Sequence, residues 1–486
     1  MQTEVFTPSQ RVLVLGLGHS GAAAAYWCAH QGWPVRLADT RAMPPSIEEL
    51  RQALVDADAQ WVLGAEALDD AILDGVSTLL LSPGLSPHEP QLAALLAKAQ
   101  QQGIECINEL TLFARALQQA AIERDYHPQL IAITGTNGKT TVACMVAHML
   151  REHGVSVQLA GNISPSCMSA WLAAKQTNQW PEVWVLECSS FQLHSMQDLR
   201  PDVGTILNIS QDHLDWHASA HDYENDKMRL LQHSDRVVYY RDDAVVRALA
   251  QQLSVPLWSF GRDHPQKERQ LGLVHDALGQ RWLAMKGAAG QSTLLLPANS
   301  LSLLGEHNEN NALAASALLA ALDWPIERMI ESLTRYRGEP HRCEWVRTVR
   351  GLRFINDSKG TNVGATVAAI RGIEAPKVLI AGGVGKGQDF SPLAEAIREG
   401  QVRHTVLYGA DALRIAQTLR AYELPHSLVA ALPQAVEQAF SLAEQQDVIL
   451  FSPACASMDQ FENYMVRGQA FIDAVNELAL DLGEVL

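Results

Sequence analysis

The sequence lacks several features that would place a protein in a membrane, outside the cell or on nucleic acid. Its seven cysteines are scattered without a Cys-x-x-Cys pair, which argues against a disulfide framework or a zinc site. No run of about 18 apolar residues occurs, so we expect no membrane span. The first residues show no basic leader before an apolar segment, so we expect a cytoplasmic protein. Lys and Arg number 37 against 54 Asp and Glu, and the formal charge of −17 disfavours nucleic acid as a partner.

What the sequence does contain is a pattern of strands and helices that restarts twice. A length of 486 residues favours about three domains. Short apolar runs alternate with helical stretches, which indicates parallel sheets. We expect strands at 11–16, 35–39, 61–63, 78–81 and near 104 in the first part, at 130–134, 182–190 and 203–210 in the second, and at 352–358, 377–383, 404–409 and 447–453 in the third, followed by a helix from about 460 to 480. The stretch 237–296 has no readable strand register.

The first glycine motif, "GLGHSG", joins the first strand to the first helix. It places Gly16, Gly18 and Gly21 in a G-x-G-x-x-G pattern, and Asp39 follows at the end of the next strand. Glycines in this pattern let the backbone approach phosphate, and the acid accepts hydrogen bonds from hydroxyl groups. The motif therefore predicts a dinucleotide-type site, although any nucleotide diphosphate could use it. A tight turn without a ligand is the alternative.

The second motif, "GTNGKTT", follows the strand 130–134 and precedes a long helix. Gly135 and Gly138 allow a turn with inward amides, Lys139 adds a cation, and Thr140 or Thr141 offers a hydroxyl to Mg²⁺. The turn is shorter than the usual phosphate loop, which has a glycine where Ile133 stands. The sequence thus predicts an α/β protein of three domains: a Rossmann-like domain at 1–115, a P-loop ATPase domain at 116–338 and a Rossmann-like domain at 339–486.

Polar side chains follow two strands of the middle domain. Glu187 ends one strand, and Asp212, His213 and Asp215 follow the next. A carboxylate in an apolar strand needs a partner or a metal, and ligands gather at the carboxyl ends of such strands. Glu187 and His213 are therefore candidate Mg²⁺ ligands, while a hydrogen-bonded structural histidine is equally compatible with the pattern. From its position alone, Lys227 would be a lysine on a helix surface.

Further polar loops lie in the third domain and at its start. "GEHNENN" contains Asn311, where asparagine as a helix cap is the strong alternative. The other loops are "EPHR", "NDSKGTN", "AGGVGKGQDF" and "SPACASMDQFENY", which contain His341 and Arg342, Asp357 to Asn362, Lys386, and Ser457 to Tyr464. They fit a site for a small polar molecule, and solvated connections are the rival interpretation.

These motifs together resemble the Mur ligase family. The matching stretches run through the whole chain in the family's order: "GLGHSG", "SPG", "GTNGKTT", "GNIS", "LECSSFQL", "NISQDHLDWH", "GEHNENN", "EPHR", "NDSKGTN" and "SPACASMDQF". "GTNGKT" alone marks a broader group that includes folylpolyglutamate synthetases. "SSFQL", "NDSKGTN" and "SPACASMDQF" favour the branch that adds D-glutamate. Val384 departs from the family, where an acidic residue is more usual, and the region after Val237 looks longer.

The resemblance implies a role for each candidate residue. For UDP-N-acetylmuramoyl-L-alanine it implies Gly18, Asp39, Thr40, Arg41, Ser82, Gly84, Asn162 and Ser189; for ATP it implies Gly135, Asn137, Gly138, Lys139, Thr140, Thr141, Asn311, Arg342 and Asp357. For D-glutamate it implies Lys359, Thr361, Lys386, Ser457 and Tyr464, and for two Mg²⁺ ions it implies Thr141, Glu187, His213 and Lys227, with Lys227 carbamylated. Lys139, Lys227, His213 and Lys359 would be the catalytic set.

The implied reaction makes an amide from a carboxylate, which is a poor electrophile in water. ATP would convert the carboxylate into an acyl phosphate, which the amine of D-glutamate would attack, in a monomeric enzyme of peptidoglycan synthesis. His341 and Arg342 would reach ATP only when the domains close. The rival functions are a ligase that uses L-glutamate, a folylpolyglutamate synthetase, an NAD-dependent oxidoreductase and a nucleotide sensor without activity.

Overall fold

The structure is a computed structural model, and it describes residues 10–45, 47–210, 212–213, 216–287, 290–303, 305–373 and 375–484. Asp215 lies outside these residues, and so do residues 1–9, on which the expectation of a missing leader rests. The chain divides into two compact units. The first comprises Met1–Ile209, Leu214–Leu296 and Leu313–Ser332, and the second comprises Ser210–His213, Pro297–Ala312 and Leu333–Leu486.

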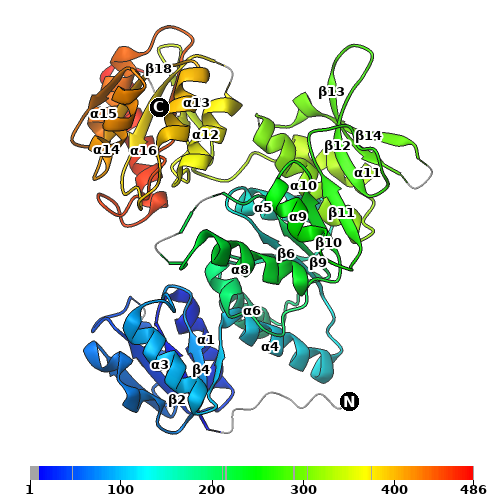
Figure 1. The fold of residues 1–486 in the computed structure, drawn as a ribbon, viewed down its shortest axis with the longest axis vertical. Helices are drawn as coiled ribbons and strands as arrows, with labels where there is room; N and C mark the ends of the chain where they lie inside the picture. Colours follow the sequence, from blue (N-terminus) through cyan, green and yellow to red (C-terminus); the bar gives the residue numbers. More distant parts are fainter. Residues whose placement is uncertain are drawn as a thin grey trace. The chain divides into compact units, whose positions relative to one another are not determined.

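The first sheet of unit 1 is parallel throughout, as the alternating pattern predicts. Its order is β3-β2-β1-β4-β5, with strands β1 (Arg11–Leu15), β2 (Val35–Asp39), β3 (Ala59–Leu63), β4 (Val76–Leu81) and β5 (Glu105–Ile107). Figure 1 labels β2 and β4 of this sheet. The strand β1 is apolar at every position after Arg11 because both of its faces are buried. Val12 and Val14 belong to one core cluster, and Leu13 and Leu15 belong to another.

Helices supply the remaining side chains of these two clusters. They are α1 (His19–His30), α2 (Ile47–Ala53), η1 (Ala65–Leu68), η2 (Asp70–Leu73), α3 (Pro90–Gln101) and α4 (Glu109–Arg124). Residues of α1 and α4 pack in the cluster of Val12, whereas residues of α3 pack in the cluster of Leu13. The cluster of Val12 continues into Trp184 of the second sheet, so the two sheets of unit 1 share one core.

The second sheet of unit 1 has nine strands in the order β14-β13-β12-β11-β10-β9-β6-β8-β7. They are β6 (Gln129–Thr134), β7 (Val157–Gly161), β8 (Val183–Glu187), β9 (Val203–Ile206), β10 (Val237–Tyr240), β11 (Leu257–Phe260), β12 (Gln270–His275), β13 (Arg281–Lys286) and β14 (Ser292–Pro297). The expected strands of this domain are confirmed. The stretch 237–296 adds five more strands, and β12 and β13 pair antiparallel.

Helices follow most of these strands. They are α5 (Lys139–Arg151), α6 (Cys167–Thr177), α7 (Ser190–His194), α8 (Ala220–Gln232), α9 (Ala244–Ala250), α10 (Glu306–Ala321) and α11 (Ile326–Met329), with the short turns η3 (Ala298–Ser300) and η4 (Ile330–Thr334). The helix α5 is the long helix predicted after the second glycine turn. Its buried side chains, such as Val142 and Val146, lie four residues apart on one face.

Unit 2 contains a six-stranded sheet in the order β15-β16-β20-β17-β18-β19. Its strands are β15 (Glu344–Val349), β16 (Leu352–Asn356), β17 (Lys377–Gly382), β18 (Val402–Tyr408), β19 (His426–Leu428) and β20 (Val448–Phe451), and its helices are α12 (Val363–Gly372), α13 (Ser391–Glu399), α14 (Ala412–Ala421), α15 (Leu432–Leu442) and α16 (Tyr464–Asp481). The sheet is parallel apart from the pair β15 and β16. The last helix begins later than expected because the side chain of Asn463 caps it.

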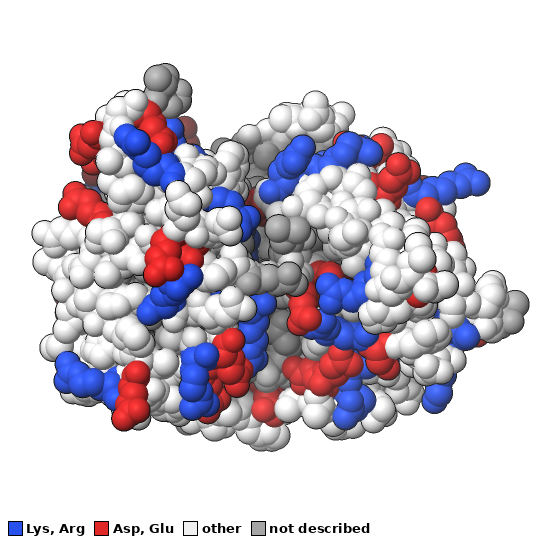
Figure 2. Space-filling view, turned by 90° about the horizontal axis from the view of Figure 1, so that it is seen from above, with Lys and Arg blue, Asp and Glu red and all other residues white. Residues whose placement is uncertain are grey.

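Charged side chains of both signs lie interspersed on the face drawn in Figure 2, without a large patch of either sign. A polyanion such as nucleic acid binds to a continuous basic stripe, and the described residues drawn there form none. Among the described residues, no helix combines the length and the apolar character needed to cross a bilayer.

Candidate functional site

The second glycine turn lies at the carboxyl end of β6, between β8 and β9. Gly138 caps α5 with φ of 86°, and Gly135 has φ of 150°. A Cβ atom on Gly135 would lie 3.3 Å from the backbone nitrogen of Asn208, so the close approach of the two segments requires glycine. Asn208 then holds the turn: its side chain accepts from Asn137 N (2.9 Å) and donates to Asn137 O (3.0 Å).

Two lysines converge on this turn. Lys139 Nζ donates to the carbonyl oxygens of Gly135 (2.8 Å) and Thr136 (2.9 Å). Lys227 Nζ donates to the same Gly135 oxygen at 3.0 Å and to Thr134 Oγ1 at 3.3 Å, and this side chain is only 1% exposed. Lys227 is therefore no surface lysine, and the interpretation from its position alone is wrong. Two cations beside a helix N-terminus favour a bound polyanion.

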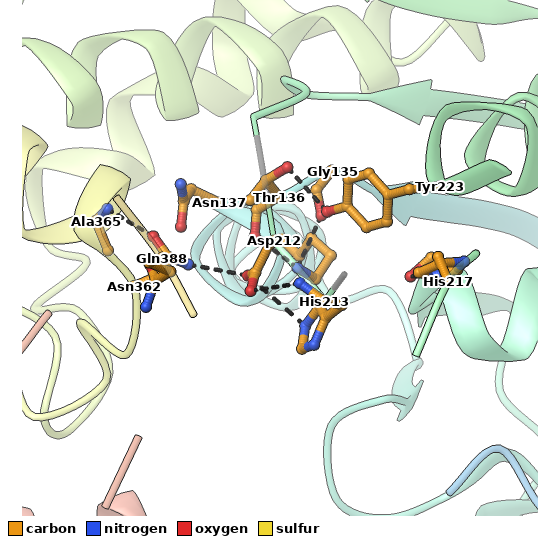
Figure 3. Close-up of polar contacts among 12 residues, drawn as sticks. Gly135, Thr136, Asn137, Asp212, His213, His217, Tyr223, Asn362, Ala365 and Gln388 are labelled. Carbon is orange, nitrogen blue, oxygen red and sulfur yellow. Dashed lines mark hydrogen bonds and ion pairs between the residues drawn. The ribbon is translucent and has the colours of Figure 1, made fainter. Parts of the chain in front are cut away.

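Tyr223 is a residue of this site that the sequence analysis missed. Its hydroxyl lies 2.9 Å from Thr136 Oγ1, as Figure 3 shows. The ring lies 4.5 Å from Lys227 Nζ, in cation–π contact. Tyr223 precedes Lys227 by one helical turn of α8, and this i, i+4 spacing was the signal available in the sequence.

Glu187 ends β8 beside the turn, as the strand pattern predicts. In the sheet register it pairs with Ile133 of β6 and with Gly161 of β7. The carboxylate is 2% exposed; one oxygen accepts from Thr140 Oγ1 and the other accepts from Asn162 Nδ2 at 2.9 Å. The structure thus brings together three of the predicted residues, Thr140, Asn162 and Glu187.

These oxygen atoms suit Mg²⁺, which usually takes one or two carboxylates together with substrate phosphates. The carboxylate of Glu187 and the hydroxyl of Thr140 supply hard oxygen donors beside the turn, and Thr141 is buried in the first turn of α5. In the described part of the chain, no group of three or more His, Cys, Asp or Glu residues could hold a metal by itself. A cation at Glu187 would therefore need further ligands, and nucleotide phosphates are suitable ones.

His213 belongs to unit 2, in the segment Ser210–His213. Its φ of 53° is the left-handed conformation, which is uncommon outside glycine, and its Nε2 lies 3.6 Å from Asp212 Oδ2. The same Asp212 oxygen accepts from Asn362 Nδ2 at 3.2 Å (Figure 3). Within unit 2 the loop that carries His213 is thus tied to the N-cap residue of α12.

The first glycine turn is shaped by close packing. A Cβ atom on Gly21 would lie 1.9 Å from the carbonyl oxygen of Gly16, and one on Gly16 would lie 2.7 Å from Ser82 Cβ. Gly18 is the N-cap residue of α1, and nothing lies within 4 Å of where its Cβ would stand. The turn therefore leaves open space at Gly18, where a phosphate could approach the helix N-terminus.

Asp39 holds this turn and Arg41 together. One oxygen accepts from Leu17 N (2.7 Å) and Arg41 Nη2 (2.7 Å), and the other accepts from Arg41 N (2.9 Å) and Nε (2.8 Å). Burial raises the pKa of Asp39, but these hydrogen bonds outweigh it and hold the pKa below its ordinary value. A carboxylate offers about four acceptor positions, and all are used. We therefore expect Asp39 to orient Arg41 for the ligand rather than to accept hydroxyl hydrogen bonds itself.

Among the other residues implied for the uridine substrate, Thr40 follows β2, and Ser82 and Gly84 follow β4, the two strands that flank β1. Thr40 and Gly84 are exposed, and Ser82 is buried where β4 ends, donating its backbone N–H to Leu15 O. Ser189 forms a capping box with Gln192 at the start of α7, so its hydroxyl has a structural partner. Its implied role in substrate binding stays a prediction.

Unit 2 places the third-domain residues at the carboxyl ends of β16, β17 and β20. Asp357 is buried there, where Ser452 Oγ (2.7 Å) and Cys343 N (3.2 Å) donate to its carboxylate. Burial raises the pKa of Asp357 to about 6, and the nearby charge of Arg342 opposes this rise. Asn311 donates to Asn308 at 3.2 Å, and both lie inside α10, so neither caps that helix.

The residues implied for the acceptor amino acid lie on three loops of unit 2. The ring of Tyr464 lies 3.9 Å from Lys359 Nζ, and Thr361 N donates to Lys359 O at 2.8 Å. Ser457 is 4% exposed, whereas Lys386 is exposed with φ of 50°. The glycine-rich loop is fixed through Val384, whose backbone exchanges hydrogen bonds with Ala456 at 2.9 Å. The departure at Val384 therefore concerns its side chain and leaves this backbone pairing in place.

Arg467 was also missed by the sequence analysis, and it braces two of these loops. The guanidinium is fully buried, and it donates to Ser358 O at 2.7 Å and to Cys455 O at 3.0 Å. It therefore fixes the loop of Lys359 against the loop of Ser457. A single arginine in the final helix gave no signal in the sequence.

The amino-acid sequence is similar to known proteins along nearly its whole length. The chain matches the models of the Mur ligase MurD-like N-terminal domain at 10–108, the Mur ligase middle domain at 133–319 and the Mur ligase glutamate ligase domain at 341–455. It is 44% identical to the UDP-N-acetylmuramoylalanine--D-glutamate ligase of Bordetella parapertussis over 98% of this chain and 97% of that protein. The ligase of the same name from Cupriavidus pinatubonensis is 42% identical over 97% and 98% of the two chains.

Two solved structures share the fold at low sequence identity. The UDP-N-acetylmuramate-alanine ligase of Thermotoga maritima superposes with a TM-score of 0.59 at 18% identity, covering 96% of this chain and all of that one. A pseudomurein peptide ligase type C from Methanothermus fervidus gives a TM-score of 0.58 at 17% identity, covering 97% and all of the two chains. The expected α/β architecture of three domains is thereby confirmed.

Proposed function

This chain belongs to the Mur ligase family of ATP-dependent ligases, and we propose that it joins D-glutamate to UDP-N-acetylmuramoyl-L-alanine in peptidoglycan synthesis. The observation that carries the proposal is the match over 98% of the chain to ligases of this activity. The two separate nucleotide-type turns agree with it, because the reaction needs a uridine-linked substrate and ATP. The uridine-linked substrate, ATP and D-glutamate are all small molecules.

The ATP turn is where we place the triphosphate. The backbone amides between Gly135 and Thr141 and the ammonium of Lys139 would surround its phosphates. Lys139 then releases the carbonyl oxygens to which it donates in this structure. Thr141, Glu187, His213 and Lys227 are the residues proposed to hold Mg²⁺, which neutralises phosphate charge when bound. The anion that Lys227 would contribute is a carbamate on its Nζ.

The chemistry follows from the weakness of a carboxylate as an electrophile. The carboxylate of the L-alanyl group attacks the γ-phosphorus in line, the bond to the β-phosphate oxygen breaks, and ADP leaves. Lys139 stabilises the negative charge that shifts onto the phosphate oxygens. The neutral amine of D-glutamate then attacks the acyl carbon, phosphate leaves with the electron pair, and one proton is released.

Each end of the reaction has its own binding residues. Gly18, Thr40, Arg41, Ser82, Gly84, Asn162 and Ser189 are proposed to bind the uridine substrate, and Lys359, Thr361, Lys386, Ser457 and Tyr464 are proposed to bind D-glutamate. Lys359 and Lys386 are cations suited to the two carboxylates of glutamate. Its amine must stay uncharged to attack.

We also propose where the enzyme acts and how its domains work together. We place the enzyme in the cytoplasm, where ATP and nucleotide sugars occur, as a monomer with domains at 1–115, 116–338 and 339–486. Asn311, Arg342 and Asp357 complete the nucleotide contacts once the domains close. Closure excludes water, which would otherwise hydrolyse the acyl phosphate.

The experiment that tests the function is phosphate release by the purified chain with ATP, Mg²⁺ and UDP-N-acetylmuramoyl-L-alanine. D-Glutamate should support release together with a product of the expected mass, and L-glutamate should not. Product formed with L-glutamate or with folate would favour the related ligases. ATP binding without release would favour a sensor, and thermal protection by NAD but not by the uridine substrate would favour an oxidoreductase.

A further inference from the structure

A buried carboxylate lies directly beside Lys227, and the proposed reaction does not use it. Asp226 is 4% exposed and accepts from His194 Nδ1 at 3.0 Å and 3.1 Å. His217 Nδ1 lies 3.2 Å from the same carboxylate, and Arg229 Nε lies 3.5 Å away. The far nitrogen of His217, Nε2, lies 2.9 Å from Ser190 Oγ. We call Asp226, His194, His217 and Ser190 the aspartate cluster.

The aspartate cluster joins the segments that carry two of the proposed Mg²⁺ ligands, Glu187 and Lys227. Ser190 and His194 lie on α7, which begins three residues after Glu187. His217 lies three residues before α8, and Asp226 precedes Lys227 by one residue on α8. The segments of Glu187 and Lys227 therefore each contribute a member to the aspartate cluster within three residues of the ligand.

Aromatic packing connects the aspartate cluster to the ATP turn. The ring of His217 contacts the ring of Tyr223 edge to face, with centroids 5.2 Å apart. Tyr223 in turn hydrogen bonds with Thr136, and its ring packs 4.5 Å from the unmodified ammonium of Lys227, before any carbamate forms. Figure 3 draws Tyr223 beside Thr136 of the turn, with His217 farther from it. A shift of His217 would therefore reach Lys227 through Tyr223 as well as through α8.

A purely structural aspartate is the alternative. It would stabilise the fold equally whether or not Lys227 carried a carbamate. A positioning role is a different function, because the contacts of Asp226 fix the turn of α8 from which Lys227 extends. Groups that orient metal ligands typically change metal affinity or activity by about 10–100-fold when removed.

We propose that Asp226, held by His194 and His217, is a positioning residue that fixes Lys227 in the place where its Nζ is carbamylated and contributes to the Mg²⁺ site. The inference rests on the proposed function, because it presumes the carbamate on Lys227. Asp226 itself does not touch the substrates or the ion. It acts through α8 and through the packing of His217 on Tyr223.

The test compares three variants of the full chain. Asp226→Ala removes the acceptor between the two imidazoles, whereas Asp226→Asn keeps the shape of the side chain and one of its two acceptor oxygens. Asp222→Ala is the matched control, since Asp222 lies four residues earlier on α8, bonds to Ser219 at its N-terminus and is half-buried. The readouts are the ¹³C NMR signal of the carbamate after incubation with ¹³C-bicarbonate, the Mg²⁺ concentration for half-maximal activity, and the urea midpoint.

We expect Asp226→Ala to lose most of the carbamate signal and to need about 10–100-fold more Mg²⁺, with Asp226→Asn in between. Extra bicarbonate should restore part of the signal. Asp222→Ala should lower the urea midpoint without changing either readout. A folded Asp226→Ala or Asp226→Asn with wild-type carbamate signal and Mg²⁺ dependence would overturn the inference. Absence of the signal from the wild type, together with full activity of Lys227→Ala, would instead overturn the proposed role of Lys227.

Discussion

Asp39 offers a sharp test of how the N-terminal domain binds its ligand. In Asp39→Asn the side-chain oxygen can face Leu17 N only if the amide NH₂ faces the guanidinium of Arg41, and the reverse orientation opposes Leu17 N–H. Two hydrogen bonds are lost either way, one from a backbone N–H and one from the guanidinium. A hydrogen bond to a charged group contributes about 1.5–3 kcal/mol, and we take the backbone bond as the measure of the loss. The contact to Arg41 counts for less, because that side chain is 52% exposed.

A loss of this size corresponds to a roughly 10- to 150-fold weaker interaction, at tenfold for each 1.4 kcal/mol. We expect the KM for the uridine substrate to rise by this factor. The KM for ATP should stay unchanged, because the ATP turn lies on another sheet. Steady-state kinetics with each substrate varied in turn measures both values. Asp58→Asn is the control, since it removes an exposed acid that pairs with Arg11 in the same domain. An unchanged KM for the uridine substrate in Asp39→Asn would refute the reasoning.

Three further predictions concern the ATP and Mg²⁺ residues. Lys227→Ala should lower kcat by roughly 10²–10³-fold, and bicarbonate should not restore it; unchanged turnover would remove Lys227 from the site. Glu187→Gln should raise the Mg²⁺ concentration needed for half-maximal activity about 10–100-fold, and wild-type Mg²⁺ dependence would exclude Glu187 as a ligand. Burial raises the pKa of Asp357 to about 6, so ionisation of this carboxyl as the pH rises from about 4 to about 6 should destabilise the folded chain by up to ~3 kcal/mol. The urea midpoint should therefore fall over this range in the wild type more than in Asp357→Asn, and equal slopes would show that Asp357 has no shifted pKa.

The strands and glycine turns could be predicted because their signals are local. An apolar run such as 11–15, followed by glycine and an alanine-rich helix, gives the same result from sequence as from structure. The strands between 237 and 296 could not be placed, because β12 and β13 are short, half-exposed and antiparallel. Their pairing depends on tertiary contacts and not on a local period.

The site residues divide in the same way. Glu187 could be predicted since a carboxylate at the end of a buried strand is unusual. The burial of Lys227 could not, because it follows from how α8 packs on β6, and helix periodicity alone does not show which partner covers a face. The role of Arg467 could not be predicted either, because tertiary packing brings it to its partners. Ser358 and Cys455 lie 109 and 12 residues away in the chain.

The central claim is that ATP activates the carboxylate of the uridine substrate as an acyl phosphate. The most direct measurement uses substrate with both oxygens of the L-alanyl carboxylate labelled with ¹⁸O, ATP, Mg²⁺ and D-glutamate, and determines the mass of the released phosphate. We predict one ¹⁸O atom in each phosphate, because the oxygen that attacks the γ-phosphorus stays with it when the amide forms. Unlabelled phosphate, released alongside the amide product, would contradict the account.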